Sequence, residues 1–201
     1  MAISRGLAGH KLPTAYPSRR AWLHVTLRDT KGRVVFSSGE AQPTGAIAGN
    51  DNDRDAARFE PHYREIHSAD QVQIYEVIMG SPGGSVTTGL LTEVSYLKDN
   101  RVPPLGFNKA VVPDDVEVRG DAADDPDFLG GEDRVRYSID VSAAEGPFTF
   151  DAELWYQSIA YRWAQNLRGY DAAEPQRFVG YFDSMAAASA VRLALASVTA
   201  R

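Results

Sequence analysis

The sequence places oxygen-bearing side chains where a hard cation could bind. They lie within residues 50–55 and are Asn50, Asp51, Asn52, Asp53 and Asp55. Because Ca²⁺ takes about six to eight oxygen ligands from flexible loops, this spacing indicates a calcium site. The glycine and glutamate of an EF-hand loop are not at their required positions, so a solvated loop with Asx turns is the alternative. A second acidic segment, residues 120–133, has the same two interpretations.

The four histidines and the absence of cysteine limit the other chemistry. His62 and His67 are five positions apart, which is neither the i,i+4 spacing of a helical zinc pair nor the i,i+2 spacing of a strand pair. The chain has no cysteine, so it has no disulfide, no thiolate metal site and no covalently attached haem c. It also has no nucleophile elbow, phosphate-binding loop or dinucleotide fingerprint. These absences favour a non-catalytic role.

Most of the chain has the two-residue periodicity of strands. Residues 20–29 alternate about Trp22, His24 and Thr26, and the turn at Gly32 leads into a second strand, which predicts a hairpin. Residues 71–79 and 85–98 predict further strands. Residues 133–141 and 146–158 predict a second hairpin-like pair. After residue 158 the apolar residues recur every three or four positions, which predicts helices over about 159–199.

These elements predict one fold class. Hydrophobic residues make up 43% and charged residues 24% of the 201 residues, which suits a globular protein with one core. About seven strands joined by turns, with helices at the end, predict a mainly-β fold: an Ig-like antiparallel β-sandwich with a C-terminal helical segment. We expect a single domain over 1–201, with the sandwich at about 18–158 and the helices at about 159–199.

Charge and hydropathy exclude two classes of partner. The net charge of −6 argues against sequence-independent nucleic-acid binding, which needs a basic surface. No apolar run approaches the roughly 20 residues of a membrane span. The first ten residues lack the apolar segment of a signal peptide.

The segment "GHKLPTAYPSRRAWLHVTLRDTKGRVVFSSG" (residues 9–39) resembles the start of the haem-free C-terminal β-domain of periplasmic and extracellular multihaem c-type cytochromes. The resemblance continues through "NDNDRDAARFEPHY", "QVQIYEVIM", "TTGLLTEVSYLKDNR" and "ELWYQSIAYRWAQNL", and so covers most of the chain. In that family the histidine of the glycine-histidine-x-x-proline motif can be the distal axial ligand of a haem attached elsewhere.

The resemblance implies a role in electron transfer and a periplasmic or extracellular location. It makes His10 a candidate haem axial ligand. Arg19 and Arg20 become candidates for pairing with haem propionates, with a strand-edge gatekeeper pair as the alternative. Because this chain has no haem-attachment motif, the haem c must belong to a partner or to an upstream segment. The chain is either a module of such a cytochrome or a haem-free reuse of one.

We therefore expect an accessory docking module of a multihaem c-type cytochrome, with calcium as a second candidate ligand. The competing function is a calcium-dependent carbohydrate-binding or adhesion β-sandwich, in which aromatic side chains would stack on sugars.

Overall fold

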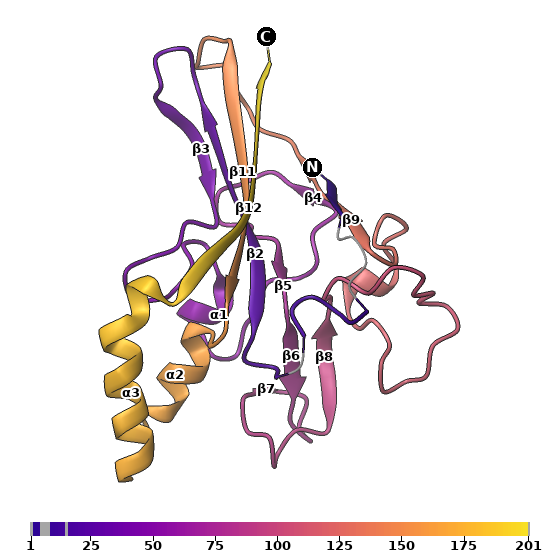
Figure 1. The fold of residues 1–201 in the computed structure, drawn as a ribbon, viewed down its shortest axis with the longest axis vertical. Helices are drawn as coiled ribbons and strands as arrows, with labels where there is room; N and C mark the ends of the chain where they lie inside the picture. The colour runs from indigo at the N-terminus through magenta and orange to yellow at the C-terminus, as the bar shows by residue number, and fades with distance from the viewer. Residues whose placement is uncertain (1, 5–8, 15, 201) are drawn as a thin grey trace.

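A long antiparallel sheet forms the centre of the molecule. The computed structural model describes residues 2–4, 9–14 and 16–200. In the sheet, β12 (Ala190–Ala200) pairs with β11 (Phe148–Gln157), β11 with β2 (Arg20–Arg28), and β2 with both β3 (Val34–Ser38) and β5 (Ile74–Tyr75). Figure 1 shows this sheet as the long axis of the fold. The predicted hairpin is β2 and β3, and Gly32 in its turn has a φ of +76°.

Three smaller sheets lie beside the long sheet. The largest has the order β7 (Val86–Thr87), β6 (Val77–Gly80), β8 (Ser95–Asp99) and is antiparallel. The pair of β1 (Ala2–Ser4) with β9 (Glu132–Arg134) is also antiparallel, whereas β4 (Glu65–Ile66) and β10 (Arg136–Tyr137) pair in parallel. The predicted mainly-β fold built on antiparallel sheets is thus confirmed.

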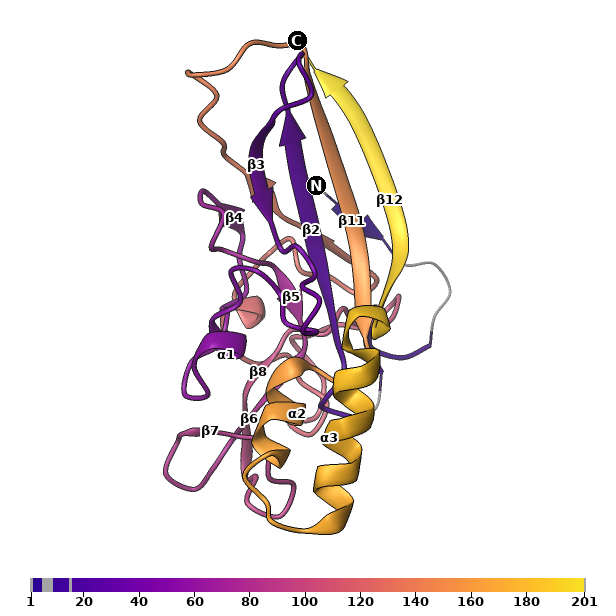
Figure 2. The ribbon, with the colours of Figure 1, turned by 90° about the vertical axis from the view of Figure 1, so that its left-hand side faces the viewer.

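The C-terminal segment corrects one prediction. Helices α2 (Tyr161–Leu167) and α3 (Ala173–Met185) are present, followed by the 3₁₀ turn η2 (Ala186–Ala188). The predicted helical segment of about 159–199 was wrong beyond residue 188, because residues 190–200 form β12 at the outer edge of the sheet (Figure 2). Apolar residues occupy nearly every position there, so their spacing fits either period. Residues 190–200 adopt the strand conformation because their backbone pairs with β11.

The second predicted hairpin does not form either. Both edges of β11 are occupied, one by β2 and the other by β12. Residues 132–137 pair instead with β1 and β4, and residues 138–147 form turns and irregular backbone. The predicted strand at 85–98 is divided into β7 and β8 by a turn. Long-range pairing of this kind leaves no local signal in the sequence.

The core lies on both faces of β2. Ala21, Leu23 and Val25 face a layer that contains Ile66 and Phe128, and all five are buried. On the opposite face Trp22 stacks on Trp155 with ring centroids 6.2 Å apart and packs against further apolar side chains, Ile47, Val72 and Ile74. The alternation follows from the two-residue period of a strand. Two layers on one central sheet give the sandwich-like arrangement.

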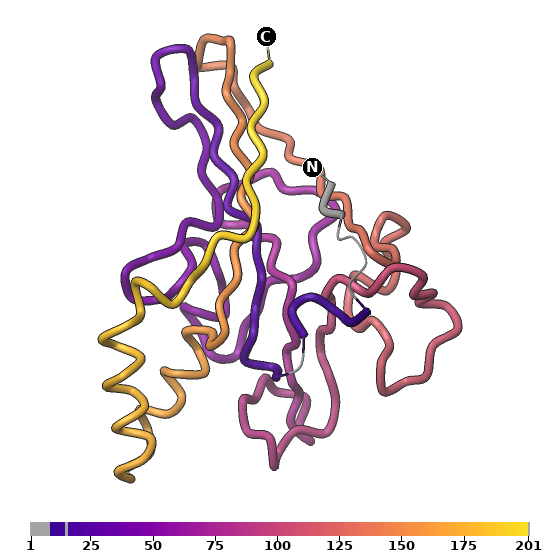
Figure 3. The backbone as a smooth tube through the Cα atoms, viewed as in Figure 1, coloured from indigo at the N-terminus to yellow at the C-terminus, as the bar shows by residue number. Residues whose placement is uncertain are grey.

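The remaining segments frame this core. Helix α1 (Asp51–Arg54) and the 3₁₀ turn η1 (Asp121–Ala123) are short, and α2 and α3 pack together through Ala164, Phe182 and Ala186. Residues 101–130 form a lobe of mostly irregular backbone on the side opposite α2 and α3 (Figure 3). Within the described part of the chain, no helix has the length and apolar character to cross a bilayer.

Candidate functional site

His10 is exposed on a short segment that is fastened to the irregular lobe. The next residue but one, Leu12, exchanges two backbone hydrogen bonds of 2.9 Å with Val102. The Nδ1 atom of His10 lies 3.0 Å from the carbonyl oxygen of Lys11. Because a carbonyl can only accept, Nδ1 carries the proton and donates it, and the lone pair is on Nε2. The ring of His10 is exposed, and within the described residues its one side-chain hydrogen bond is made by Nδ1.

Lys11 fastens this segment to residues 99 and 117. Its Nζ donates to Asp99 Oδ2 at 2.7 Å and to the Glu117 carbonyl at 3.0 Å. Arg101 Nε and Nη2 also donate to Asp99, at 2.8 and 2.7 Å. Burial opposes ionisation of Asp99, but the hydrogen bonds and charges of Arg101 and Lys11 outweigh it and lower the pKa of Asp99. Burial also disfavours the charged form of Lys11 and so lowers its pKa, although the negative charge of Asp99 opposes this shift.

An open hollow of about 400 Å³ lies beside Lys11. It combines cationic side chains with an aromatic and aliphatic wall, lined by Lys11, Thr14, Arg101, Pro104, Phe107, Asp115 and Val116. Phe107, Pro104 and Val116 give the hollow an apolar wall, while its two cations, Lys11 and Arg101, pair with Asp99.

The two arginines of the motif are in different surroundings. Arg19 is half-buried and donates from Nη1 to the Thr14 carbonyl at 3.1 Å. Arg20 is 1% exposed, and its Nη1 lies 2.9 and 3.0 Å from the two carboxylate oxygens of Asp53. Its Nε and Nη2 donate to Gln157 and to the Gly45 carbonyl. Arg20 is therefore a structural cation inside the fold, in a strand paired on both sides, and only Arg19 is placed near the His10 segment.

The oxygens of residues 50–55 are used within the fold. Asn50 is the N-cap of α1, and its Oδ1 accepts from the Asn52 backbone at 3.1 Å. Asp51 forms an ion pair with Arg58, and Asp53 pairs with Arg20 and accepts from the Ile47 backbone at 2.8 Å. Asn52 donates its amide to the Arg58 carbonyl, and Asp55 accepts from the Ala57 backbone. These contacts agree with the capped-loop alternative, and calcium binding there stays a prediction.

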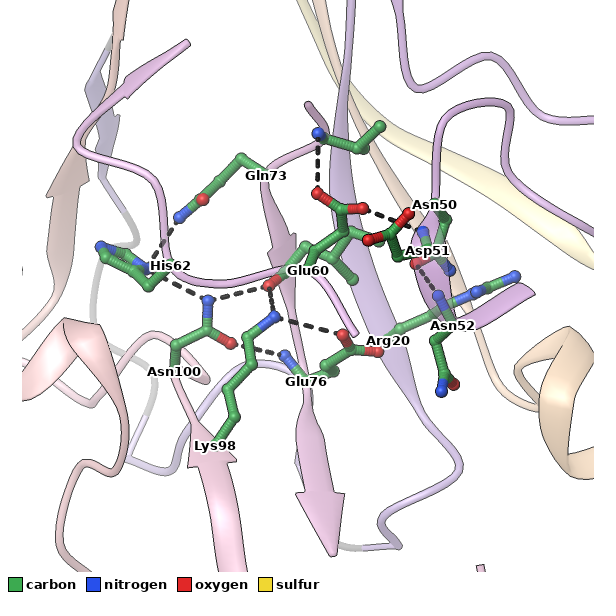
Figure 4. Close-up of polar contacts among 12 residues, drawn as sticks. Arg20, Asn50, Asp51, Asn52, Glu60, His62, Gln73, Glu76, Lys98 and Asn100 are labelled. Carbon is green, nitrogen blue, oxygen red and sulfur yellow. Dashed lines mark hydrogen bonds and ion pairs between the residues drawn. The ribbon is translucent and has the colours of Figure 1, made fainter. Parts of the chain in front are cut away.

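Residues far apart in the sequence meet in a buried polar network around His62 (Figure 4). Gln73 Nε2 and Asn100 Nδ2 lie 2.8 and 3.1 Å from His62 Nδ1. Lys98, whose side chain is 2% exposed, donates to the Ile74 carbonyl at 2.9 Å and to Glu76 at 3.1 Å. Such a network is stable only when its members are satisfied.

Glu60 joins this network to the loop at residues 50–55. It is 1% exposed and accepts from the Tyr63 hydroxyl at 2.7 Å and from the Asp51 backbone at 2.9 Å. Burial raises the pKa of Glu60, although these hydrogen bonds oppose the shift. The carboxylate therefore fastens the start of α1 to the core.

On its other side His62 faces two buried carboxylates. His62 Nε2 is 3.3 Å from Asp125 Oδ2 and 3.7 Å from Asp133 Oδ1. Asp133 Oδ2 accepts from the Tyr75 hydroxyl at 2.6 Å, while Asp133 Oδ1 has no hydrogen-bond partner among the described residues. The three facing atoms lie within 4.8 Å of one another, the one such histidine-carboxylate group among the described residues. Sequence analysis missed it because its members lie at positions 62, 125 and 133, in segments interpreted separately.

Comparisons with known proteins give one distant likeness. No family model matches the chain, and no curated protein matches it. The chain is similar to a solved penta-haem cytochrome c552 from Thermochromatium tepidum, with a TM-score of 0.49 and 13% identity, over 95% of this chain and 33% of that chain. The present chain thus spans about a third of the length of that multihaem cytochrome.

Proposed function

We propose that this chain is a non-catalytic docking module of a multihaem c-type cytochrome, and that His10 Nε2 binds the iron of a haem carried by the partner or by an upstream segment. The observation that carries the proposal is the state of the His10 ring. A backbone carbonyl 3.0 Å from Nδ1 favours the Nδ1–H tautomer, in which Nε2 carries the lone pair that a metal-ligating histidine needs.

The surroundings of His10 suit a haem. The Leu12–Val102 bridge and the Lys11–Asp99 ion pair hold the segment at a fixed place on the fold. The adjoining hollow offers Phe107 and Val116 to a macrocycle edge, while its two cations, Lys11 and Arg101, pair with Asp99. In this proposal Arg19, which is half-buried, keeps the propionate-pairing role that the resemblance implies for the arginine pair.

A second histidine on the iron would close it to substrates and suit electron transfer. The proposal therefore assigns no reaction to this chain. It places the chain in the periplasm or outside the cell, where haem c is attached. The calcium-dependent adhesion function has no comparable support, because the oxygens of residues 50–55 serve as caps and ion-pair partners.

The experiment is a titration with a haem c peptide that carries one histidine ligand and an open sixth position. We expect the wild-type chain to convert the haem to a low-spin bis-histidine spectrum. His10→Ala should weaken this binding by at least about tenfold, which is 1.4 kcal/mol. The matched control is His67→Ala, which removes another exposed histidine and should leave the titration unchanged. Equal binding by His10→Ala and the wild type would remove His10 from the proposal.

A further inference from the structure

The tautomer of His62 is fixed by two amides whose own orientations are fixed. Gln73 Oε1 accepts from the Tyr63 backbone at 2.8 Å, so its Nε2 is the group that faces His62 Nδ1. Asn100 Oδ1 accepts from the Glu76 backbone at 3.0 Å, so its Nδ2 also faces Nδ1. With two N–H donors directed at it, Nδ1 must be an acceptor. The proton of neutral His62 is therefore on Nε2.

This tautomer argues against a metal ion between His62, Asp125 and Asp133. A metal ion needs the lone pair of the facing nitrogen, and here that nitrogen carries the proton. Turning Gln73 over would direct its NH₂ group at the Tyr63 N–H and its oxygen at Asp133 Oδ2, which now accepts from Gln73 Nε2 at 3.3 Å. The cluster is consequently organised for a proton.

A single N–H, that of His62 Nε2, lies between the facing oxygens of the two carboxylates. His62 Nε2–H is closer to Asp125 Oδ2, at 3.3 Å, than to Asp133 Oδ1, at 3.7 Å. Asp133 Oδ1 is buried, and no other donor in the described part of the chain bonds to it. An ionised carboxylate with an unpartnered buried oxygen is costly. Protonation of that oxygen removes the charge and supplies a donor that can turn towards Asp125.

We propose that the His62–Asp125–Asp133 cluster is a buried proton-binding site, in which folding places on Asp133 Oδ1 the proton that His62 would hold in the unfolded chain. The transfer conserves the proton count, since a charged imidazole and a carboxylate become a neutral imidazole and a carboxylic acid. The native cluster thereby avoids burying a further charge pair beside the Lys98–Glu76 pair.

The electrostatic surroundings act in the same direction. Burial, followed by the charge of Lys98, lowers the pKa of His62 from 6.5 to about 4, although Asp125 and Asp121 oppose the shift. Burial, followed by the charge of Asp125, raises the pKa of Asp133 from 3.8 to about 6. The other polar or charged groups that face the cluster are Gln73, Tyr75, Asn100, Tyr137, Arg64 and Lys109.

The two shifts have opposite effects on the pH dependence of stability. The lowered pKa of His62 makes its contribution complete above pH 6.5, and that contribution is lost as the pH falls towards 4. The raised pKa of Asp133 makes its contribution complete below pH 3.8, and that contribution is lost as the pH rises through 6. Between about pH 4 and 6 the two terms cancel, because folding moves the proton without net uptake.

Substituting either residue alone should therefore make the free energy of unfolding depend on pH, with opposite signs for the two residues. We would measure the free energy of unfolding by denaturant from pH 4 to 6.5 for the wild type, Asp133→Asn, His62→Gln and the double variant. Relative to the wild type, Asp133→Asn should gain stability with rising pH, and His62→Gln should lose it. Each slope should approach about one proton per molecule, and the double variant should again run parallel to the wild type. Single variants that both run parallel to the wild type would overturn the proposal.

A second measurement keeps the test decisive where a variant does not fold. In ¹⁵N-labelled wild-type protein, the His62 ring nitrogens should report the Nε2–H tautomer, uncharged at pH 5.5. A charged ring or the Nδ1–H tautomer at that pH would contradict the site. Addition of Zn²⁺ should produce no His62-dependent rise in melting temperature, and such a rise would show that the cluster binds metal.

Discussion

His10 and His62 are the same side chain in opposite settings. His10 is exposed, and its Nδ1 makes its one ring hydrogen bond within the described structure, to a backbone carbonyl. His62 is buried, and both of its nitrogens face groups of the fold itself. The first arrangement leaves a ligand atom for a partner, whereas the second uses the ring to join segments of the core. The role of each histidine therefore depends on the hydrogen-bond partners of its two ring nitrogens.

We expect the stability of the fold to depend on the buried network around His62, and the proposed haem binding to depend on the His10 segment. Substitutions in the two regions should therefore separate these properties. Four variants test this difference between the two regions. Their expected effects on the free energy of unfolding decrease from Lys98→Met to His10→Ala.

The largest effect is expected at the buried ion pair of the network. Lys98→Met removes the two bonds from Nζ and leaves Glu76, whose side chain is 6% exposed, without its cation. Loss of one partner of a buried pair costs about 3–5 kcal/mol. The control is Arg168→Met, which breaks an exposed pair with Asp183 and should cost less than about 1 kcal/mol. Similar losses in denaturant unfolding for both variants would show that the network is not a main source of stability.

A smaller loss is expected from Tyr75→Phe. The Tyr75 hydroxyl, 2.6 Å from Asp133 Oδ2, makes a hydrogen bond to a charged group at neutral pH, and its removal should cost about 1.5–3 kcal/mol. The pKa of Asp133 should then rise further above about 6, since this bond opposes the shift. Tyr137→Phe is the matched control, because the buried Tyr137 hydroxyl has no hydrogen-bond partner in the part of the chain that the structure describes. It should leave the free energy of unfolding unchanged or raise it by up to about 1 kcal/mol. An equal loss for both variants would contradict the role of the Asp133 bond.

Local pattern was enough to predict the parts of the fold that depend on neighbouring residues. The β2–β3 hairpin follows from alternation on either side of Gly32, and α2 from the change of period after residue 158. The strand β12 and the pairing of β11 with β2 depend on contacts between chain ends, which alternation cannot specify. Residues 190–199 were consequently predicted as a helix, and the strand at 146–158 was predicted to pair with residues 133–141.

The candidate sites divide along the same line. His10 was named from a short motif, and its one ring hydrogen bond in the described structure is to the adjacent residue. Arg20 belongs to the same motif, but its bidentate partner Asp53 is 33 positions away, so its burial has no signal in the sequence. His62 was considered as a zinc ligand with His67, and its actual partners, Gln73, Asn100, Asp125 and Asp133, lie on four separate segments. Polar networks assembled from distant positions need the fold before they can be recognised.

The anchor of the His10 segment should give a third, intermediate effect. Lys11→Met removes the bonds to Asp99 and to the Glu117 carbonyl, while Arg101 still pairs with Asp99, so we expect a loss of about 1–1.5 kcal/mol. The lowered pKa of Asp99 makes its contribution to stability present above 3.8 and lost as the pH falls. Without Lys11 the pKa of Asp99 should rise towards 3.8, and the loss of stability in acid should begin at a higher pH. An acid unfolding profile identical to that of the wild type would show that Lys11 does not stabilise the Asp99 carboxylate.

The smallest change in stability is expected where the largest change in binding is expected. His10 is exposed and makes a single ring hydrogen bond to the adjacent residue within the described structure, so His10→Ala should alter the free energy of unfolding by less than about 0.5 kcal/mol. The same variant should lose the low-spin haem spectrum in the haem c peptide titration, while Lys98→Met, wherever it remains folded, should retain it. A destabilised His10→Ala variant would mean that this ring also supports the fold, and the contrast with His62 would then fail. A stable variant that no longer binds haem would show that His10 faces a partner and His62 faces the core.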